Sequence, residues 1–170
     1  MYANAWMTVR EDAIRRADGS DGVYGVIDKP DYALVMPWDG ERFMLVEQFR
    51  YPLGLRRWEF PQGTAPQRAD ADPVELARRE LREETGLRAD RIEEIGLLDV
   101  APGMSSQRGR VFLATELTQG APERELEEQD MRAAWFPRRH FERMVAAREI
   151  TDAQSVAAYT LLLLHERAAH

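Results

Sequence analysis

The sequence predicts an α/β fold in which helices cover a mixed β-sheet. Runs rich in β-branched and aromatic residues recur as far as residue 136, and helical patterns occupy residues 73–85 and the C-terminal part from residue 139. Strands flanked by helices in this order are typical of a sandwich of helix and sheet layers. With 170 residues, 44% of them hydrophobic, the chain is expected to form a single domain over residues 1–170.

The expected strands are short runs between turn residues. The turn signal Trp38-Asp39-Gly40 lies between the runs 32–36 and 43–49, so these two runs are expected to pair as a hairpin. Further strands are expected at residues 24–28, 57–60, 92–100, 110–116 and 131–136.

The first expected helix spans about residues 73–85 and has clear signals at both ends. Asp72 followed by Pro73 is typical of an N-cap with proline at the first helical position. Gly86 suits the left-handed residue that ends a helix, and Leu87 is the apolar residue that packs back on the last turn. Two more helices are expected at about residues 139–147 and 152–166.

Composition narrows the classes of function. The net charge of −7 argues against a general nucleic-acid surface, which needs a basic patch. The absence of cysteine excludes disulfides and cysteine–zinc sites. No apolar run approaches the roughly 20 residues of a membrane span, and the N-terminal sequence lacks the features of a signal peptide. We therefore expect a cytoplasmic protein that binds neither nucleic acid nor a membrane.

Three carboxylates are the most informative feature of the first helix. Glu80, Glu83 and Glu84 lie three and four residues apart, so they share one helix face and repel one another. A cation would offset this repulsion, and clustered carboxylate oxygens suit Mg²⁺ or Mn²⁺. The alternative is a solvated acidic face, in which Arg79 pairs with Glu83.

The surrounding pattern favours the metal site. The segment from Gly63 to Leu87 resembles a Nudix box, and its run Arg-Glu-Leu-Arg-Glu-Glu-Thr-Gly-Leu, residues 79–87, matches that pattern in every position. The front of the box departs from the pattern: the loop after Gly63 is two residues longer, and the family's first glutamate falls on Ala71. Asp70 or Asp72 could substitute for that glutamate, whose main role in the family is to orient the arginine of the motif.

The resemblance extends over nearly the whole chain. The runs 45–52, 58–63 and 101–105 are similar to the Nudix branch that hydrolyses ADP-ribose and related nucleoside diphosphate sugars. This similarity implies a nucleotide-sugar substrate and a Nudix α/β/α sandwich with a metal-binding loop-helix-loop. It also implies a homodimer, in which N-terminal strands within residues 1–28 contribute to the contact between subunits.

The same resemblance assigns the expected metal ligands. Glu80 and Glu84 would be the principal ligands, and Glu83 would share or bridge metal ions. The backbone carbonyl of Gln62 would add a further oxygen. Arg79 would hold the carboxylates in place.

The general base in this branch is a glutamate on the loop before the last strand, which here covers residues 123–130. Alignment favours Glu127 and then Glu128, and it places Gln129 where a family glutamate often lies. The alternative is an acidic loop with no catalytic part.

Arg50 and Arg108 are expected to contact the diphosphate, because one guanidinium group can donate two parallel hydrogen bonds to phosphate oxygens. For Arg108 we give equal weight to a purely structural role. Glu59 is expected either to bind substrate or metal, or to be a surface residue of an edge strand.

Two further readings of function stay open at this point. A nucleoside triphosphate or dinucleotide could be the substrate on the same scaffold. A module that binds ADP-ribose without hydrolysing it would fit the altered front of the box and Gln129, but it would not need three metal-binding carboxylates.

Overall fold

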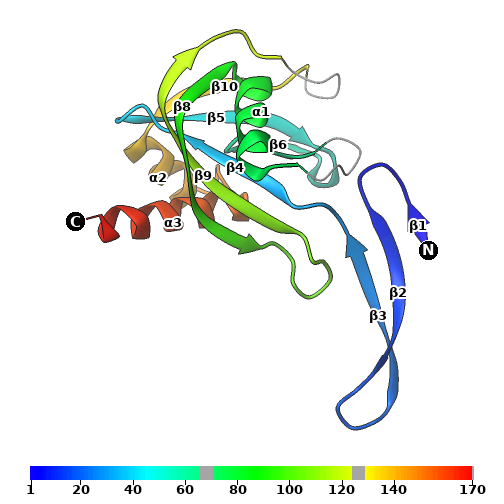
Figure 1. Ribbon diagram of the computed structural model, residues 1–170. Coiled ribbons are helices and arrows are strands. Elements are labelled where there is room, and N and C mark those ends of the chain that lie inside the picture. The colour runs from blue at the N-terminus through cyan, green and yellow to red at the C-terminus, as the bar shows by residue number, and fades with distance from the viewer. Residues whose placement is uncertain (66–70, 124–128, 170) are drawn as a thin grey trace.

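The computed structural model describes residues 1–65, 71–123 and 129–169. These residues form a layered body and an arm that projects from it (Figure 1). The body contains two β-sheets and three α-helices within the described residues.

The larger sheet has the strand order β7-β4-β9-β8. β4 runs parallel to β9, whereas β4 with β7 and β8 with β9 are antiparallel, so the sheet is mixed as predicted. Its strands are β4 (Tyr32–Pro37), β7 (Gln62–Thr64), β8 (Leu87–Asp99) and β9 (Arg108–Gln119).

The second sheet is antiparallel and has the order β10-β5-β6. It contains β5 (Arg42–Arg50), β6 (Leu55–Glu59) and β10 (Arg132–Pro137), and a 3₁₀ turn, η1 (Tyr51–Leu53), joins β5 to β6.

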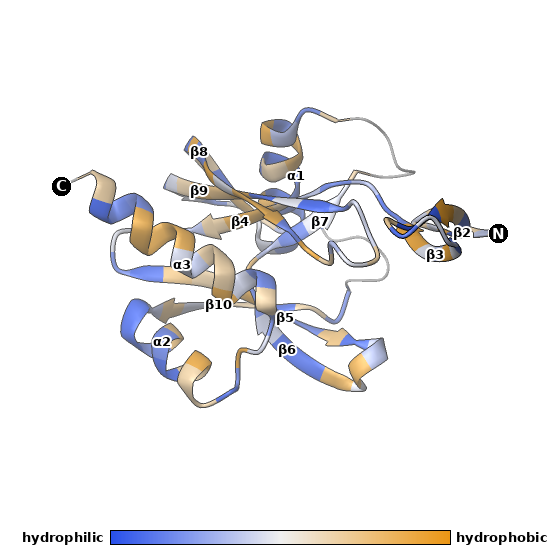
Figure 2. Ribbon diagram, turned by 90° about the horizontal axis from the view of Figure 1, so that it is seen from below, coloured by the Kyte–Doolittle hydropathy of each residue, from blue (hydrophilic) through white to orange (hydrophobic). Residues whose placement is uncertain are grey.

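Helices cover both faces of the mixed sheet. α1 (Pro73–Thr85) packs against one face, and α3 (Ala153–Ala168) packs against the other and lies between the two sheets (Figure 2). α2 (Arg138–Ala146) packs against β5 and β10. The strand period explains this arrangement, because alternate residues of β4 belong to two cores: Ala33 and Val35 to the α1 core, Leu34 and Met36 to the α2 and α3 core. The predicted sandwich is confirmed.

The predicted hairpin between residues 32–36 and 43–49 is wrong. The turn forms, with Asp39 accepting hydrogen bonds from the backbone of Glu41 and Arg42, and Trp38 is bridged to Phe43. Beyond that bridge, β4 and β5 enter different sheets. The reason is that β9 pairs along the whole of β4 on one edge and β7 pairs with residues 32–34 on the other, so β5 cannot pair along the length of β4.

The arm consists of β1 (Tyr2–Ala3), β2 (Thr8–Arg15) and β3 (Asp21–Asp28) in a sheet of their own. Its attachment to the body is local. The backbone N–H of Ile27 donates to the carbonyl of Met104 at 2.7 Å, and the Tyr24 hydroxyl donates to that of Gly103 at 2.8 Å.

The ends of α1 are as predicted. The Asp72 side chain accepts hydrogen bonds from the backbone of Val74 and Glu75, and Gly86 ends the helix with a φ of 76°. Leu81 and Leu87 are both 1% exposed and belong to the same core.

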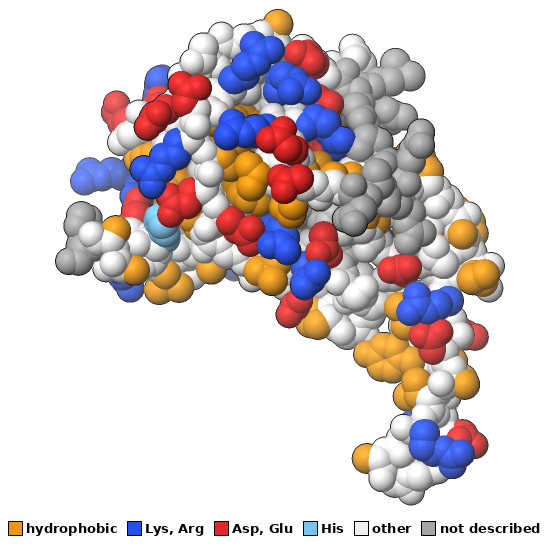
Figure 3. Space-filling view, viewed as in Figure 1, with side chains coloured by type: hydrophobic (Ala, Val, Ile, Leu, Met, Phe, Trp, Pro, Cys, Tyr) orange, Lys and Arg blue, Asp and Glu red, His pale blue; other side chains and the backbone are white. Residues whose placement is uncertain are grey.

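None of the helices in the described parts of the chain combines the length and the hydrophobicity that crossing a membrane would need. On the face that carries α1 and β8, acidic and basic side chains are interspersed (Figure 3).

Candidate active site

The carboxylates of α1 lie at the interface between helix and sheet. Glu80 is 5% exposed and Glu84 is 1% exposed, while Glu83 is half-buried. The reading of this face as a solvated surface is therefore wrong for Glu80 and Glu84. Burying two carboxylates one turn apart is unfavourable unless charges or hydrogen bonds compensate for it.

Arg79 supplies part of that compensation. Its Nη2 donates to Glu80 Oε1 at 2.8 Å, and its Nε lies 3.4 Å from Glu83 Oε2. The same Nη2 also donates to the backbone carbonyl of Thr64 at 2.9 Å, which ties the helix to β7.

These contacts explain how the arginine is oriented although Ala71 replaces the family's first glutamate. The Thr64 carbonyl, at the end of β7, accepts a hydrogen bond from Arg79 and so fixes the position of its guanidinium group. Of the two proposed substitutes, Asp72 is engaged as the N-cap of α1, and Asp70 lies outside the described residues.

Gly63 brings the β7 backbone against Glu80. A Cβ atom at this position would lie 2.2 Å from Glu80 Oε2, so the carboxylate would have to move away from the backbone. A glycine is therefore required for the close approach between the carboxylate and the backbone next to Gln62.

A divalent cation fits this set of donors by chemistry, because carboxylate and carbonyl oxygens are the ligands that Mg²⁺ and Mn²⁺ prefer. Within residues 1–65, 71–123 and 129–169, however, no three acidic or histidine side chains are grouped closely enough to hold one ion together. The assignment of Gln62, Glu80, Glu83 and Glu84 as metal ligands stays a prediction.

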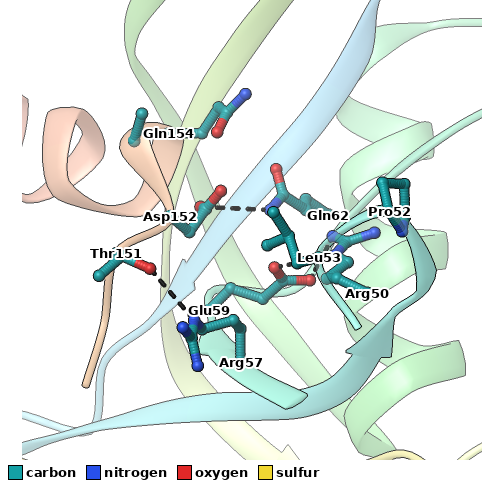
Figure 4. A pocket seen from close by; sticks show the side chains of 10 residues that line it. Arg50, Pro52, Leu53, Arg57, Glu59, Gln62, Thr151, Asp152 and Gln154 are labelled. Atoms are coloured by element: carbon teal, nitrogen blue, oxygen red, sulfur yellow. Dashed lines mark hydrogen bonds and ion pairs between the residues drawn. The ribbon is translucent and has the colours of Figure 1, made fainter. Parts of the chain in front are cut away.

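A pocket of about 410 Å³ opens beside the segment 59–62. Figure 4 shows Arg50, Glu59, Gln62 and Asp152 turned toward one another in it. We refer to it as the main cleft; its other lining residues are Pro52, Leu53, Arg57, Thr151, Ala153 and Gln154.

Glu59 is buried within this cleft, at 1% exposure, so its reading as a surface residue of an edge strand is wrong. Gln48 Nε2 donates to its Oε1 at 2.7 Å, Arg50 Nε donates to its Oε2 at 3.2 Å, and the Arg50 guanidinium forms an ion pair with it. Burial raises the pKa of Glu59 to about 7, with Asp152 adding to the rise, although Arg50 and Gln48 act in the opposite direction.

The N-terminus of α3 anchors the segment 59–62. Asp152 Oδ2 accepts from the Ser155 backbone at 2.8 Å and from Gln62 Nε2 at 3.4 Å. The buried Ser155 hydroxyl accepts from the backbone N–H of Phe60 at 2.9 Å. The sequence predicted residue 152 as a helix start but did not predict its contact with Gln62, because the two residues lie 90 positions apart.

A second pocket, of about 240 Å³, adjoins the main cleft and shares Arg50, Gln62 and Gln154 with it. We call it the lysine pocket, after Lys29. Its remaining lining residues are Tyr32, Gly63, Thr64, Val100 and Gln107.

Arg108 and the two loop glutamates are the remaining candidate residues. Arg108 pairs with Asp31 at 3.0 Å and lines neither of the two pockets. Glu127 and Glu128, the candidates for the general base, lie outside the described residues.

Comparison with known proteins places this geometry in a family. The family model described as NUDIX domain matches residues 28–158, and the model described as nucleoside diphosphate sugar hydrolase N-terminal domain matches residues 1–27. The chain therefore belongs to the Nudix hydrolase family, and the resemblance inferred from its sequence is confirmed.

Two curated relatives carry the name ADP-ribose pyrophosphatase. One, from Mycobacterium tuberculosis, is 35% identical over 167 residues, which cover 97% of this chain and 79% of the relative. The other, from Bacillus subtilis, is 32% identical over 135 residues, covering 79% and 72% respectively. A solved structure described as an ADP compounds hydrolase superposes with a TM-score of 0.86 at 19% identity, covering 99% of this chain and 91% of that one, so the two share a fold.

Proposed function

We propose that this protein hydrolyses the pyrophosphate bond of ADP-ribose or a related nucleoside diphosphate sugar, giving a nucleoside monophosphate and a sugar phosphate. The observation that carries the proposal is the similarity to ADP-ribose pyrophosphatase of M. tuberculosis over 97% of the chain. The buried carboxylates of α1, set against Gly63, support it, because they lie next to a cleft lined by Arg50 and Gln62.

The residues of α1 and β7 would hold a divalent ion, Mg²⁺ or Mn²⁺. Glu80 and Glu84 would be its main ligands, with Glu83 and the Gln62 carbonyl as further donors. Such an ion would neutralise phosphate oxygens and make the phosphorus a better electrophile. Arg79 orients Glu80 and Glu83 through the contacts described above.

The remaining roles concern substrate and water. Arg50 would contact the diphosphate, while Glu59 limits the movement of its guanidinium. Arg108 is the weaker candidate for the diphosphate because Asp31 already engages it. Glu127 or Glu128 would accept the proton from the attacking water.

We also propose that the protein is a homodimer in which the arm contributes to the contact. Apolar side chains of the arm are exposed to solvent: Tyr2 is 59%, Trp6 65% and Val23 62% exposed. Exposed apolar groups gathered on one projecting element are typical of an interaction surface. The family model described as nucleoside diphosphate sugar hydrolase N-terminal domain matches residues 1–27, which make up nearly all of this arm.

The test is hydrolysis of a panel of nucleotides with Mg²⁺, with Mn²⁺, and with EDTA. The panel contains ADP-ribose, GDP-mannose, UDP-glucose, NADH, diadenosine polyphosphates and nucleoside triphosphates. Metal-dependent release of AMP and ribose 5-phosphate from ADP-ribose is the expected result. If triphosphates or dinucleotides are turned over in preference, the proposed substrate class is wrong and one of these compounds is the substrate. Binding of ADP-ribose without turnover of any compound would contradict the proposed hydrolysis.

A further inference from the structure

Lys29 is the only lysine in a chain with 23 basic residues, and it lines the lysine pocket. Its neighbours in sequence, Asp28 and Asp31, are each engaged by an arginine: Arg10 lies 3.9 Å from Asp28, and Arg108 lies 3.0 Å from Asp31. Among the described residues, no carboxylate forms an ion pair with Lys29. Its charge is therefore available to a ligand.

The walls of the lysine pocket suit an anion. No acidic residue of the described chain lines it, although the protein as a whole carries a net charge of −7. Arg50 is held in an ion pair with buried Glu59, whereas Lys29 has no carboxylate partner among the described residues and presents its charge to the pocket. The main cleft differs in this respect, because Glu59 and Asp152 are part of its lining.

A buried hydroxyl in the same pocket points independently to a ligand. Tyr32 is 7% exposed, and no described group forms a hydrogen bond with its Oη. Burial, with the charge of Asp152 adding to it, keeps the pKa of Tyr32 well above its usual value, so the hydroxyl stays protonated and able to donate. Buried polar groups in folded proteins nearly always have a partner, and a bound ligand would supply one here.

We propose that the lysine pocket is a phosphoryl-binding subsite, in which Lys29 supplies the positive charge and the Tyr32 hydroxyl donates to a phosphate oxygen. The pocket borders Gly63 and Gln62, beside the carboxylates of α1. The proposal rests on the proposed function in one respect: the phosphoryl group is that of the sugar phosphate half of the substrate. The shared residues Arg50 and Gln62 then mark the boundary, and the nucleoside half occupies the larger main cleft.

The single lysine allows a direct test that needs no turnover. Acetylation of amines, followed by mass spectrometry, modifies Lys29 and the α-amino terminus, which serves as the internal control. Inorganic phosphate and ribose 5-phosphate are expected to slow acetylation of Lys29 at least threefold and to leave the terminus unchanged, whereas ribose has no effect. Equal protection by ribose, or protection by none of the three, would overturn the proposal.

Variants then connect the subsite to the reaction. Lys29→Gln is expected to lower kcat/KM for the best nucleoside diphosphate sugar about tenfold, mainly through KM, whereas Lys29→Arg retains most of the activity. Arg139→Gln, an exposed cation outside both pockets, is the matched control and should change nothing.

Tyr32→Phe separates a ligand contact from a structural role. Removing a buried hydroxyl that lacks a partner should leave the free protein at least as stable, while the stabilisation by ribose 5-phosphate in thermal unfolding is lost. A loss of stability without ligand would contradict the role given to the hydroxyl. If phosphate protects Lys29 but the wild type hydrolyses no nucleotide of the panel, the subsite stands and the proposed function fails.

Discussion

Gly63 and Glu80 are so close that one methyl group is expected to disturb the site. In Gly63→Ala the new Cβ would lie 2.2 Å from Glu80 Oε2, so the carboxylate must move. A displacement of about 1 Å in a catalytic group can cost about 100-fold, and we expect a loss of that size in kcat. Gly25→Ala is the control, since nothing lies within 4 Å of its Cβ. Retention of kcat within twofold by a folded Gly63→Ala protein would refute this role of Gly63.

Glu59 is expected to make stability depend on pH. Its pKa is raised in the folded protein to about 7, so the folded state binds a proton more tightly than the unfolded state. Its contribution to the unfolding free energy is complete below pH ~4.5 and is lost as pH rises through about 7, by about 3 kcal/mol in total. The measurement is urea unfolding of the wild type and of Glu59→Gln from pH 4 to pH 8. Their difference in unfolding free energy should change with pH in this window, and a constant difference would contradict the raised pKa.

The contact between α3 and the segment 59–62 is an element-scale feature that stabilises the site. Ser155→Ala removes the acceptor of the Phe60 N–H inside the protein, which should lower the unfolding free energy by about 1–3 kcal/mol. Thr160→Ala, on the exposed side of the same helix, should cost less than about 0.5 kcal/mol. Chemical denaturation of both variants checks the prediction, and equal losses would argue against the anchor.

Elements that depend on local signals could be predicted from the sequence. Asp72, Pro73 and Gly86 define the ends of α1 within a few residues, and its period places Glu80 and Glu84 together. Contacts between distant positions could not be predicted. Ser155 and Phe60 are 95 positions apart, and nothing near either residue indicates the other. The hairpin prediction failed for the same reason, because distant β9 and β7 occupy the edges of β4.

At the scale of the whole molecule, the arm is expected to hold two subunits together. Light scattering should give a mass near 39 kDa, twice the 19.6 kDa of one chain. Replacing Trp6 and Val23 by serine removes exposed apolar groups from the arm and should shift the protein toward the monomer. A wild type that is monomeric at all concentrations would contradict the proposed dimer.

The proposed function of the whole protein requires that the buried carboxylates of α1 bind the metal ion used in hydrolysis. The most direct measurement is the kcat of Glu84→Gln on ADP-ribose with Mg²⁺, compared with the wild type, after circular dichroism has shown that the variant is folded. We expect a loss of at least about 100-fold, because glutamine keeps the size of the side chain but removes the charge that would bind the metal. A folded Glu84→Gln protein with full Mg²⁺-dependent turnover would contradict the assignment of α1 as the catalytic helix.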